Sequence, residues 1–215
     1  NLADLMDIDA VYVCDEARGS ARAGEAHTTS LRAYNRENYK PHFLIEGLYE
    51  SGTKKKPKWG DPYVFDGART RRQAYWAILC GAMGHVFGNY PVWPLQPGWD
   101  GPEGLDSRGY GEMKHLKALF TAYAWWKLVP DQKHATVTAG LGGYGGADYV
   151  TAARADDGSL VMAYLPPTGT EPRTLTVDMG RLCAPAVARW YNPAAGTYQP
   201  IDNTSLGNTG TRQFT

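Results

Sequence analysis

The first part of the chain alternates between short apolar runs and longer stretches with a helical apolar stripe. Three short runs are predicted strands: Asp9–Val13, Lys40–Glu46 and His85–Gly88. The run Lys40–Glu46 shows no polar alternation, which is typical of a parallel strand covered on both faces. Three helices are predicted: His27–Asn38, with Thr28, Thr29 or Ser30 near its N-cap, about Ala68–Ala82, and about Gly111–Leu128. This order predicts successive right-handed crossovers in a parallel sheet.

The pattern changes after residue 134, where short strands are separated by turn-forming residues. Strands are predicted over Asp148–Arg154, Ser159–Leu165, Arg173–Met179 and Ala186–Tyr191. The first two flank an Asp-Asp-Gly turn at residues 156–158, which indicates a hairpin. Strands of this length and spacing favour a small antiparallel sandwich. We therefore divide the chain into an α/β part, residues 1–133, and an all-β part, residues 134–215.

Composition narrows the possible partners. The chain has 22 basic and 22 acidic residues, so its formal net charge of zero argues against a broad electrostatic grip on nucleic acid or an anionic membrane. No apolar run approaches the roughly 20 residues of a membrane span. Seven Trp and fourteen Tyr are present. Core packing accounts for most such residues, but exposed ones also provide flat surfaces for the apolar faces of sugar rings.

Several apparent motifs carry no chemistry. The three Cys and five His residues lack metal-ligand spacing, so no metal is predicted. The segment Gly140–Gly145 satisfies GxGxxG, but a strand follows where a dinucleotide site needs a helix. The basic run Lys54–Lys58 is interpreted as a solvated loop. We predict no cofactor.

Glu46 is the strongest catalytic candidate. It stands at the C-terminal end of an otherwise apolar strand, where a charge is costly unless it faces a polar cleft. In a (β/α) barrel the C-terminal ends of the strands form the active site, and paired carboxylates cleave glycosides. The alternative is a Glu that forms a structural ion pair with a helix residue such as Arg71 or Arg72.

A family resemblance favours the catalytic interpretation. The strand ending in Glu46, the Tyr49-Glu50 pair and the Arg-led helix with Tyr-Trp at 75–76 are followed by Gly-Ala-Met-Gly-His-Val-Phe-Gly at 81–88. This succession resembles the apiosidase-like glycoside hydrolases of family 140 and its relatives. The turn at 190–196 resembles one in the C-terminal domain of these enzymes, labelled as collagen-binding. The resemblance covers about residues 7–200, and residues 41–93 are its specific part.

The resemblance implies a fold and a site. It assigns the three strands to strands six, seven and eight of a (β/α)8 TIM barrel, followed by the β-sandwich. Glu46 becomes the nucleophile of a retaining mechanism, and the acid/base lies on strand four, outside this chain. The residues expected at the substrate are Tyr49, Glu50, His85, Trp93 and Trp99. The alternatives for His85 and Trp93 are a core histidine bonded to the backbone and a packing tryptophan. Two departures, Phe87 for the usual Tyr and Asn192 for the usual Asp, do not touch Glu46.

The expected substrate is an oligosaccharide or polysaccharide, with complex plant-type glycans implied by the family. The family also implies a secreted or periplasmic protein. Both ends of the sequence look cut, so we expect a fragment of a longer enzyme, inactive as it stands. The oligomeric state cannot be inferred. The rival functions are a non-catalytic carbohydrate- or matrix-binding protein that acts through the β-domain, and a pure scaffold.

Overall fold

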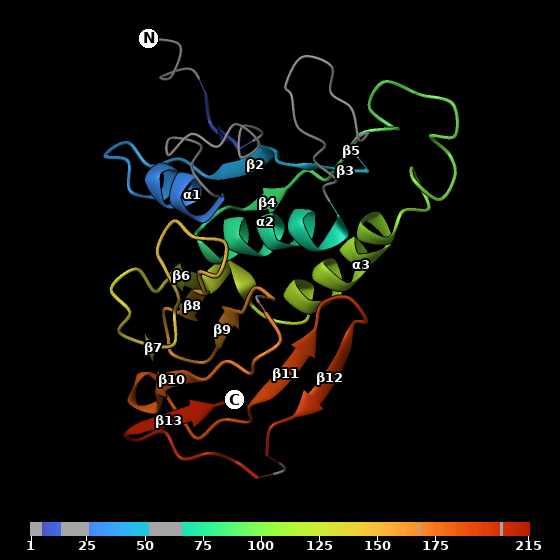
Figure 1. The fold of residues 1–215 in the computed structure, drawn as a ribbon. Coiled ribbons are helices and arrows are strands. Elements are labelled where there is room, and N and C mark those ends of the chain that lie inside the picture. The colour runs from blue at the N-terminus through green and yellow to red at the C-terminus, as the bar shows by residue number, and fades with distance from the viewer. Residues whose placement is uncertain (1–5, 14–25, 52–65, 168, 203) are drawn as a thin grey trace.

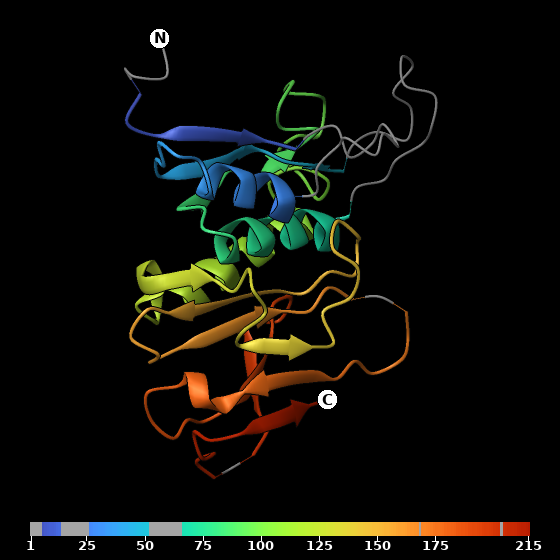
Figure 2. The same cartoon turned by 90° about the vertical axis from the view of Figure 1, so that its left-hand side faces the viewer.

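The computed structural model describes residues 6–13, 26–51, 66–167, 169–202 and 204–215. The elements form layers (Figures 1 and 2). A parallel sheet lies at one end, the helices follow it, and antiparallel strands lie beyond the helices. The molecule is therefore a mixed α/β structure with several small sheets, and the helices lie between the parallel and the antiparallel strands.

The parallel sheet has the order β1-β2-β4. Its strands are β1 (Asp9–Tyr12), β2 (His42–Glu46) and β4 (Gly84–His85), and both neighbouring pairs are parallel. The helices α1 (Ala26–Tyr34) and α2 (Gly67–Leu79) lie between them in sequence. The parallel pairing predicted for the first part of the chain is confirmed.

The third predicted strand, His85–Gly88, is wrong as a single element. The chain forms β4 and then β5 (Gly88–Asn89), which pairs in parallel with β3 (Tyr49–Glu50) in a separate sheet. The strand β4 pairs with β2 and the strand β5 pairs with β3, so two short strands form in place of one continuous strand. Gly88 permits the close approach of β5 to β3, because a Cβ there would lie 3.0 Å from the Tyr49 ring.

The helix ends also differ from the prediction. The helix α1 begins at Ala26, so Thr28, Thr29 and Ser30 lie inside it and not at its N-cap. The helix α2 is capped by Asp66, whose side chain accepts a 2.9 Å hydrogen bond from the Arg69 amide.

The third helix is shorter than predicted at its C-terminus. The helix α3 spans Arg108–Thr121, and the chain continues through a 3₁₀ turn at Trp125–Lys127 into β6 (Leu128–Pro130). Leu128 pairs with Ala155 of the antiparallel sheet. Residues that the helical periodicity predicted as helix are therefore part of the sheet, because pairing with a distant strand outweighs the local pattern.

Every pairing in the C-terminal part is antiparallel. One sheet has the order β6-β8-β9, with β8 (Thr151–Ala155) and β9 (Val161–Tyr164). The other strands are β7 (Val137–Ala139), β10 (Leu175–Asp178), β13 (Thr211–Phe214), β11 (Arg189–Asn192) and β12 (Thr197–Pro200). They form the sheet β13-β10-β7 and the pair β11-β12. A 3₁₀ turn spans Met179–Arg181. The predicted hairpin at 156–158 joins β8 to β9, with Gly158 at a positive φ of 74°.

One apolar cluster joins the two parts of the chain. Trp76 of α2 is fully buried, and its indole nitrogen donates a 2.9 Å hydrogen bond to the Tyr149 carbonyl. The Tyr75 ring stacks on Tyr164 of β9, with centroids 4.7 Å apart. The same cluster includes Leu44 of β2. The helix α2 is thus buried against the parallel sheet on one side and the antiparallel sheet on the other.

We predict that Trp76→Phe lowers the free energy of unfolding. The change leaves the buried Tyr149 carbonyl without its donor, which costs about 1–3 kcal/mol, and the smaller ring adds a cavity cost. Urea unfolding followed by circular dichroism measures the difference. The matched control is Trp126→Phe, because Trp126 is 71% exposed. Equal stability of the two variants would contradict the shared core.

Candidate active site

Glu46 is the last residue of β2, at the carboxyl end of the parallel sheet. Its side chain is half-buried, and its carbonyl accepts a 3.0 Å hydrogen bond from the Val13 amide of the neighbouring chain segment. The turn that follows is held from α2, where Gln73 Oε1 accepts a 2.6 Å hydrogen bond from the Leu48 amide. Backbone bonds on both sides therefore fix the position from which Glu46 projects.

The arginines proposed as structural partners of Glu46 are engaged elsewhere. Arg71 is buried and forms an ion pair with Glu112 of α3. Arg72 lies over the Trp76 ring at 4.6 Å and donates to the Ala147 carbonyl at 3.3 Å. These contacts favour the interpretation in which the Glu46 carboxylate is available for chemistry.

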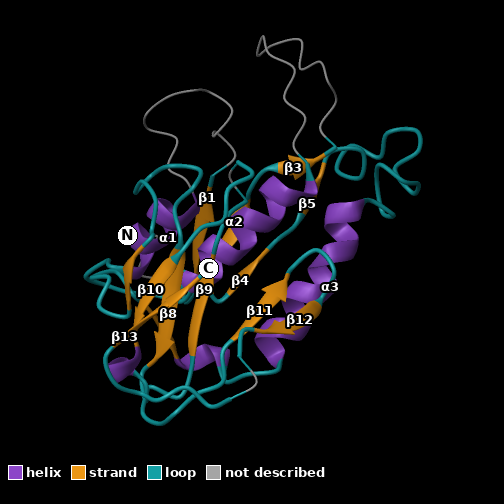
Figure 3. Ribbon diagram, turned by 60° about the horizontal axis from the view of Figure 1, so that its bottom comes forward, coloured by secondary structure: helices purple, strands orange, loops and turns teal. Residues whose placement is uncertain are grey.

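An aromatic pair lies just beyond Glu46. Tyr49 follows it by three residues, and the Tyr49 and Trp93 rings meet edge to face with centroids 6.3 Å apart. Trp93 is 69% exposed, so its ring is accessible to a ligand. Figure 3 shows β3 and β5 side by side at this end of the molecule. Trp99 is carried by the same connection between β5 and α3 and is partly exposed.

His85 lies in β4, where its register partner is Leu44 of β2. Burial lowers the pKa of His85 to about 4, so the imidazole is neutral at pH 7. A neutral ring offers one hydrogen-bond donor and one acceptor without a charge. Contact between His85 and a sugar stays a prediction, as it does for Tyr49, Trp93 and Trp99.

Glu50 occupies a different environment from Glu46. It is only 5% exposed, and its carboxylate accepts hydrogen bonds from Ser107 Oγ at 2.7 Å, Gly109 N at 2.8 Å and Tyr110 N at 3.2 Å. These donors surround the N-terminus of α3, where a negative charge is stabilised by the helix dipole. Gly109 has no room for a side chain, because a Cβ would lie 2.6 Å from Glu50 Oε1. The contacts give Glu50 a structural role, and a role in binding substrate stays a prediction.

Sequence reasoning missed Asn89 and Ser107. Asn89 is buried at the end of β5, and its side-chain amide donates to the Glu103 carbonyl at 3.0 Å, the Gly104 carbonyl at 3.3 Å and Ser107 Oγ at 3.1 Å. Ser107 is the N-cap residue of α3, but its hydroxyl bonds to Glu50 and not to the helix backbone. Ser107 stands four residues before the start predicted for this helix, so its position in the sequence predicted neither a cap nor a contact with Glu50.

The glycine-rich segment at 140–145 contains turns, with positive φ at Gly140, Gly142 and Gly145. The strand β8 follows it, as the sequence predicted in place of a helix. The Gly145 amide donates a 3.1 Å hydrogen bond to His27 Nε2 of α1. The segment therefore connects the two parts of the chain. The basic run Lys54–Lys58 lies outside the described residues.

Within the described ranges, no group of three or more His, Cys, Asp or Glu side chains is arranged to hold a metal ion. Likewise, none of the helices in that part of the chain is long and apolar enough to cross a membrane. The carboxyl end of the parallel sheet carries the Glu46 carboxylate, and Tyr49 and Trp93 place aromatic rings on the segments that follow.

Comparison with known families agrees with the local pattern. Residues 2–127 match the family described as "Apiosidase-like, catalytic domain". The chain belongs to the apiosidase-like family. Residues 129–215 match "Putative collagen-binding domain of a collagenase". No curated protein matches the chain.

Two solved structures are similar to this apiosidase-like chain. One, described as "Glycoside hydrolase", is 26% identical with a TM-score of 0.72. The other, a glycoside hydrolase family 5 protein from Bacteroides vulgatus ATCC 8482, is 19% identical with a TM-score of 0.70, and this likeness concerns the fold alone. Each alignment covers 89% of this chain and 42% of the solved chain. The chain thus spans less than half the length of these glycoside hydrolases.

The two departures from the apiosidase-like pattern, Asn192 and Phe87, each make local contacts. Asn192 Oδ1 accepts hydrogen bonds from the amides of Ala194 at 2.9 Å and Ala195 at 3.2 Å, a turn that Asp forms equally well. Phe87 contacts the rings of His85 and Tyr110, with centroids 6.3 and 6.2 Å away. Neither substitution removes an interaction of Glu46.

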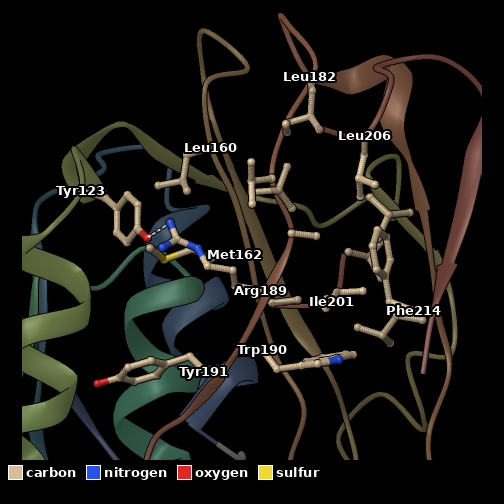
Figure 4. A pocket seen from close by; sticks show the side chains of 18 of the residues that line it. Tyr123, Leu160, Met162, Leu182, Arg189, Trp190, Tyr191, Ile201, Leu206 and Phe214 are labelled. Atoms are coloured by element: carbon tan, nitrogen blue, oxygen red, sulfur yellow. Dashed lines mark hydrogen bonds between the residues drawn. The ribbon is translucent and has the colours of Figure 1, made fainter. Parts of the chain in front are cut away.

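The structure also has a cavity lined by other residues (Figure 4). It is an apolar cavity of about 660 Å³ between the helices and the antiparallel strands, and Tyr123, Trp190 and Phe214 are among its lining residues. At its edge Arg189 donates a 3.1 Å hydrogen bond to the Tyr123 hydroxyl. Among the described residues that line the cavity, none carries a carboxylate, whereas glycoside cleavage requires two.

We predict that acidification destabilises the protein through its buried histidines. Burial lowers the pKa of His27, His42 and His85 to about 4, with Arg72 adding to the effect at His27 and Arg36 at His42. The unfolded chain binds these protons near pH 6.5 and the folded chain does not. Stability is therefore full above pH 6.5 and is lost as the pH falls toward 4, by up to about 3 kcal/mol for His27.

Thermal unfolding at pH 7.5 and pH 4.5 measures this dependence. The variant His27→Gln retains an acceptor for the Gly145 amide but has no titratable ring, so its loss on acidification should be smaller. The matched control is His134→Gln, because the half-buried His134 lies at the rim of the Tyr149 ring, with centroids 6.2 Å apart. A wild-type protein equally stable at both pH values would contradict this account.

Proposed function

We propose that the protein is part of a glycoside hydrolase in which Glu46 is the nucleophile of a retaining, two-carboxylate mechanism. The observation that carries the proposal is the place of Glu46 at the carboxyl end of a parallel strand, three residues before Tyr49, whose ring meets the exposed Trp93. The engagement of Arg71 and Arg72 by other groups supports it. The similarity to glycoside hydrolases of more than twice this length supports an acid/base partner outside the chain.

The exposed face of the parallel sheet supports a (β/α)8 barrel as the complete fold. Val11 and Leu44 point toward the helices and are buried, whereas their strand neighbours Tyr12 and Ile45 are exposed. Side chains alternate between the faces of a strand, so the exposed pair lies on the face away from the helices. In a closed barrel this face is the packed interior. The remaining strands of such a barrel would cover it.

The proposed chemistry requires two carboxyl groups about 5–5.5 Å apart, one ionised and one protonated. Glu46 attacks the anomeric carbon and forms a glycosyl-enzyme, while the partner acid protonates the leaving oxygen. The partner then acts as a base and activates the water that releases the sugar. The exposed Trp93 ring stacks on the apolar face of the sugar. Complex plant-type glycans and a secreted or periplasmic location belong to this proposal through the family.

The rival function is a binding protein that acts through the C-terminal β-domain. The observation in its favour is the match of residues 129–215 to a collagen-binding domain. The effect of removing the Glu46 carboxylate distinguishes the enzyme from the binding protein, because a binding protein does not need Glu46. Sequence alone offers the same discrimination, since an Asp or Glu at the end of strand four of the complete protein supports the enzyme.

We predict that Glu46→Gln in the full-length protein lowers kcat on its substrate by on the order of 10³-fold or more, because catalytic groups that act as a unit lose most of their effect together. Release of sugars from a panel of plant-glycan oligosaccharides measures the rate. The matched control is Glu37→Gln, which removes an exposed carboxylate. A full-length protein indifferent to Glu46→Gln would favour the binding module.

Two further results test the mechanism. With Glu46→Ala and added azide, a retaining enzyme yields a glycosyl azide of inverted configuration, because azide enters from the face that the carboxylate vacates. The isolated chain of 215 residues should be inactive on the same panel. Activity of the isolated chain would place the acid/base within it, and Glu50, Asp15 or Glu16 would become the candidates, the last two lying outside the described residues.

A further inference from the structure

The connection between β5 and α3 folds on itself without a strand or an α-helix. We call residues 90–106 the tryptophan loop, since they carry Trp93 and Trp99. The Trp93 amide donates a 3.0 Å hydrogen bond to the Asn89 carbonyl, and the Leu105 amide donates one of 3.0 Å to the Trp99 carbonyl. Gly104 approaches so closely that a Cβ would lie 1.7 Å from that carbonyl. The loop therefore has a defined shape although both tryptophans are partly exposed.

Three buried polar side chains hold the two ends of this loop together. Asn89 precedes the loop, Ser107 follows it, and Glu50 lies on the neighbouring strand β3. The Asn89 amide reaches Ser107 Oγ at 3.1 Å, and Ser107 Oγ in turn donates to Glu50 Oε2 at 2.7 Å. Asn89 Oδ1 also accepts a 3.3 Å hydrogen bond from the Val92 amide within the loop. The Ser107 hydroxyl thus links Asn89, at the start of the loop, to Glu50, in addition to the bonds that Asn89 makes to the Glu103 and Gly104 carbonyls near its end.

The network has an energetic consequence. A buried polar group costs free energy when it lacks a partner, so each member depends on the others. Glu50 fixes the N-terminus of α3 through Gly109 and Tyr110, while Asn89 fixes the loop through the carbonyls of Glu103 and Gly104. The three side chains are held by polar contacts, whereas the two parts of the chain are joined by the apolar cluster around Trp76. Loss of the link should therefore release the loop before it weakens the core.

We propose that Asn89, Ser107 and Glu50 are positioning residues that hold the tryptophan loop so that Trp93 stays against Tyr49, which follows Glu46 by three residues. The proposal rests on the proposed function and deepens it. In this proposal the tryptophan loop binds the apolar face of a sugar ring, and the three buried side chains determine the shape of the loop. In this arrangement the three residues act on sugar binding through Trp93.

Ser107→Ala in the full-length protein tests the proposal most cleanly. The Ser107 side chain makes no capping bond to α3, so the change removes the link and spares the helix end. We expect KM to rise about tenfold while kcat changes less than about twofold. This pattern results when a variant loses binding energy that is equal in the substrate complex and in the transition state. Cleavage by chymotrypsin within residues 90–106, located by mass spectrometry, should be at least about fivefold faster. The matched control is Asp106→Asn, which changes an exposed carboxylate next to Ser107 and should alter neither quantity.

A double-mutant cycle with Trp93→Ala separates positioning from a general structural role. If Ser107 acts through Trp93, Ser107→Ala should raise KM little further in the Trp93→Ala protein. Asn89→Ala, which breaks the same link from the other end, should repeat the pattern. An undiminished effect of Ser107→Ala in the Trp93→Ala protein would overturn the proposal, and so would unchanged chymotrypsin cleavage.

The cleavage measurement does not depend on activity, so it keeps this proposal separate from the proposed function. Faster cleavage of Ser107→Ala in a protein whose activity ignores Glu46→Gln would retain the positioning network and reject the nucleophile. Normal cleavage and KM in Ser107→Ala, in a protein that Glu46→Gln inactivates, would reject the network and retain the nucleophile.

Discussion

The burial of α2 between two sheets is the constraint on which the rest of the structure depends. Its outer surface would face water in an isolated α/β layer, but here Trp76 bonds the Tyr149 carbonyl and Tyr75 stacks on Tyr164. The antiparallel sheet therefore belongs to the same core as β2. Because α2 also supplies Gln73 to the turn after Glu46, the C-terminal part of the chain supports the position of the catalytic candidate through α2.

Two carboxylates four residues apart have opposite environments. Glu46 ends a strand with a half-buried side chain, while Glu50 is enclosed by donors at the N-terminus of α3. The second arrangement uses the carboxylate to join β3, the tryptophan loop and α3, whereas Glu46 stays the candidate for chemistry. Turning the Glu50 carboxylate toward a ligand would break its hydrogen bonds to the protein, and this costs free energy. The hydrogen bonds therefore favour a structural role for Glu50.

Much of the fold and part of the site could be predicted from local pattern. The unbroken apolar run at 42–46 marks a parallel strand, and its terminal Glu marks the candidate nucleophile. The order of elements could not give the end of α3, because Leu128 leaves the helical stripe to pair with Ala155. The order of elements also could not show that residues 84–89 form two strands, because β4 pairs with β2 and β5 pairs with β3.

The sequence by itself determined what depends on neighbours along the chain: the apolar strands, the Asp-Asp-Gly hairpin, the strand after the glycine-rich segment and the placement of Glu46 at a strand end. Only the tertiary structure decided the roles of Glu50, Asn89 and Ser107. The donors to Glu50 stand 57–60 positions away along the chain. Periodicity carries no information over that distance, because a hydrogen bond between distant segments depends on how the layers pack, and packing is settled by the burial of α2.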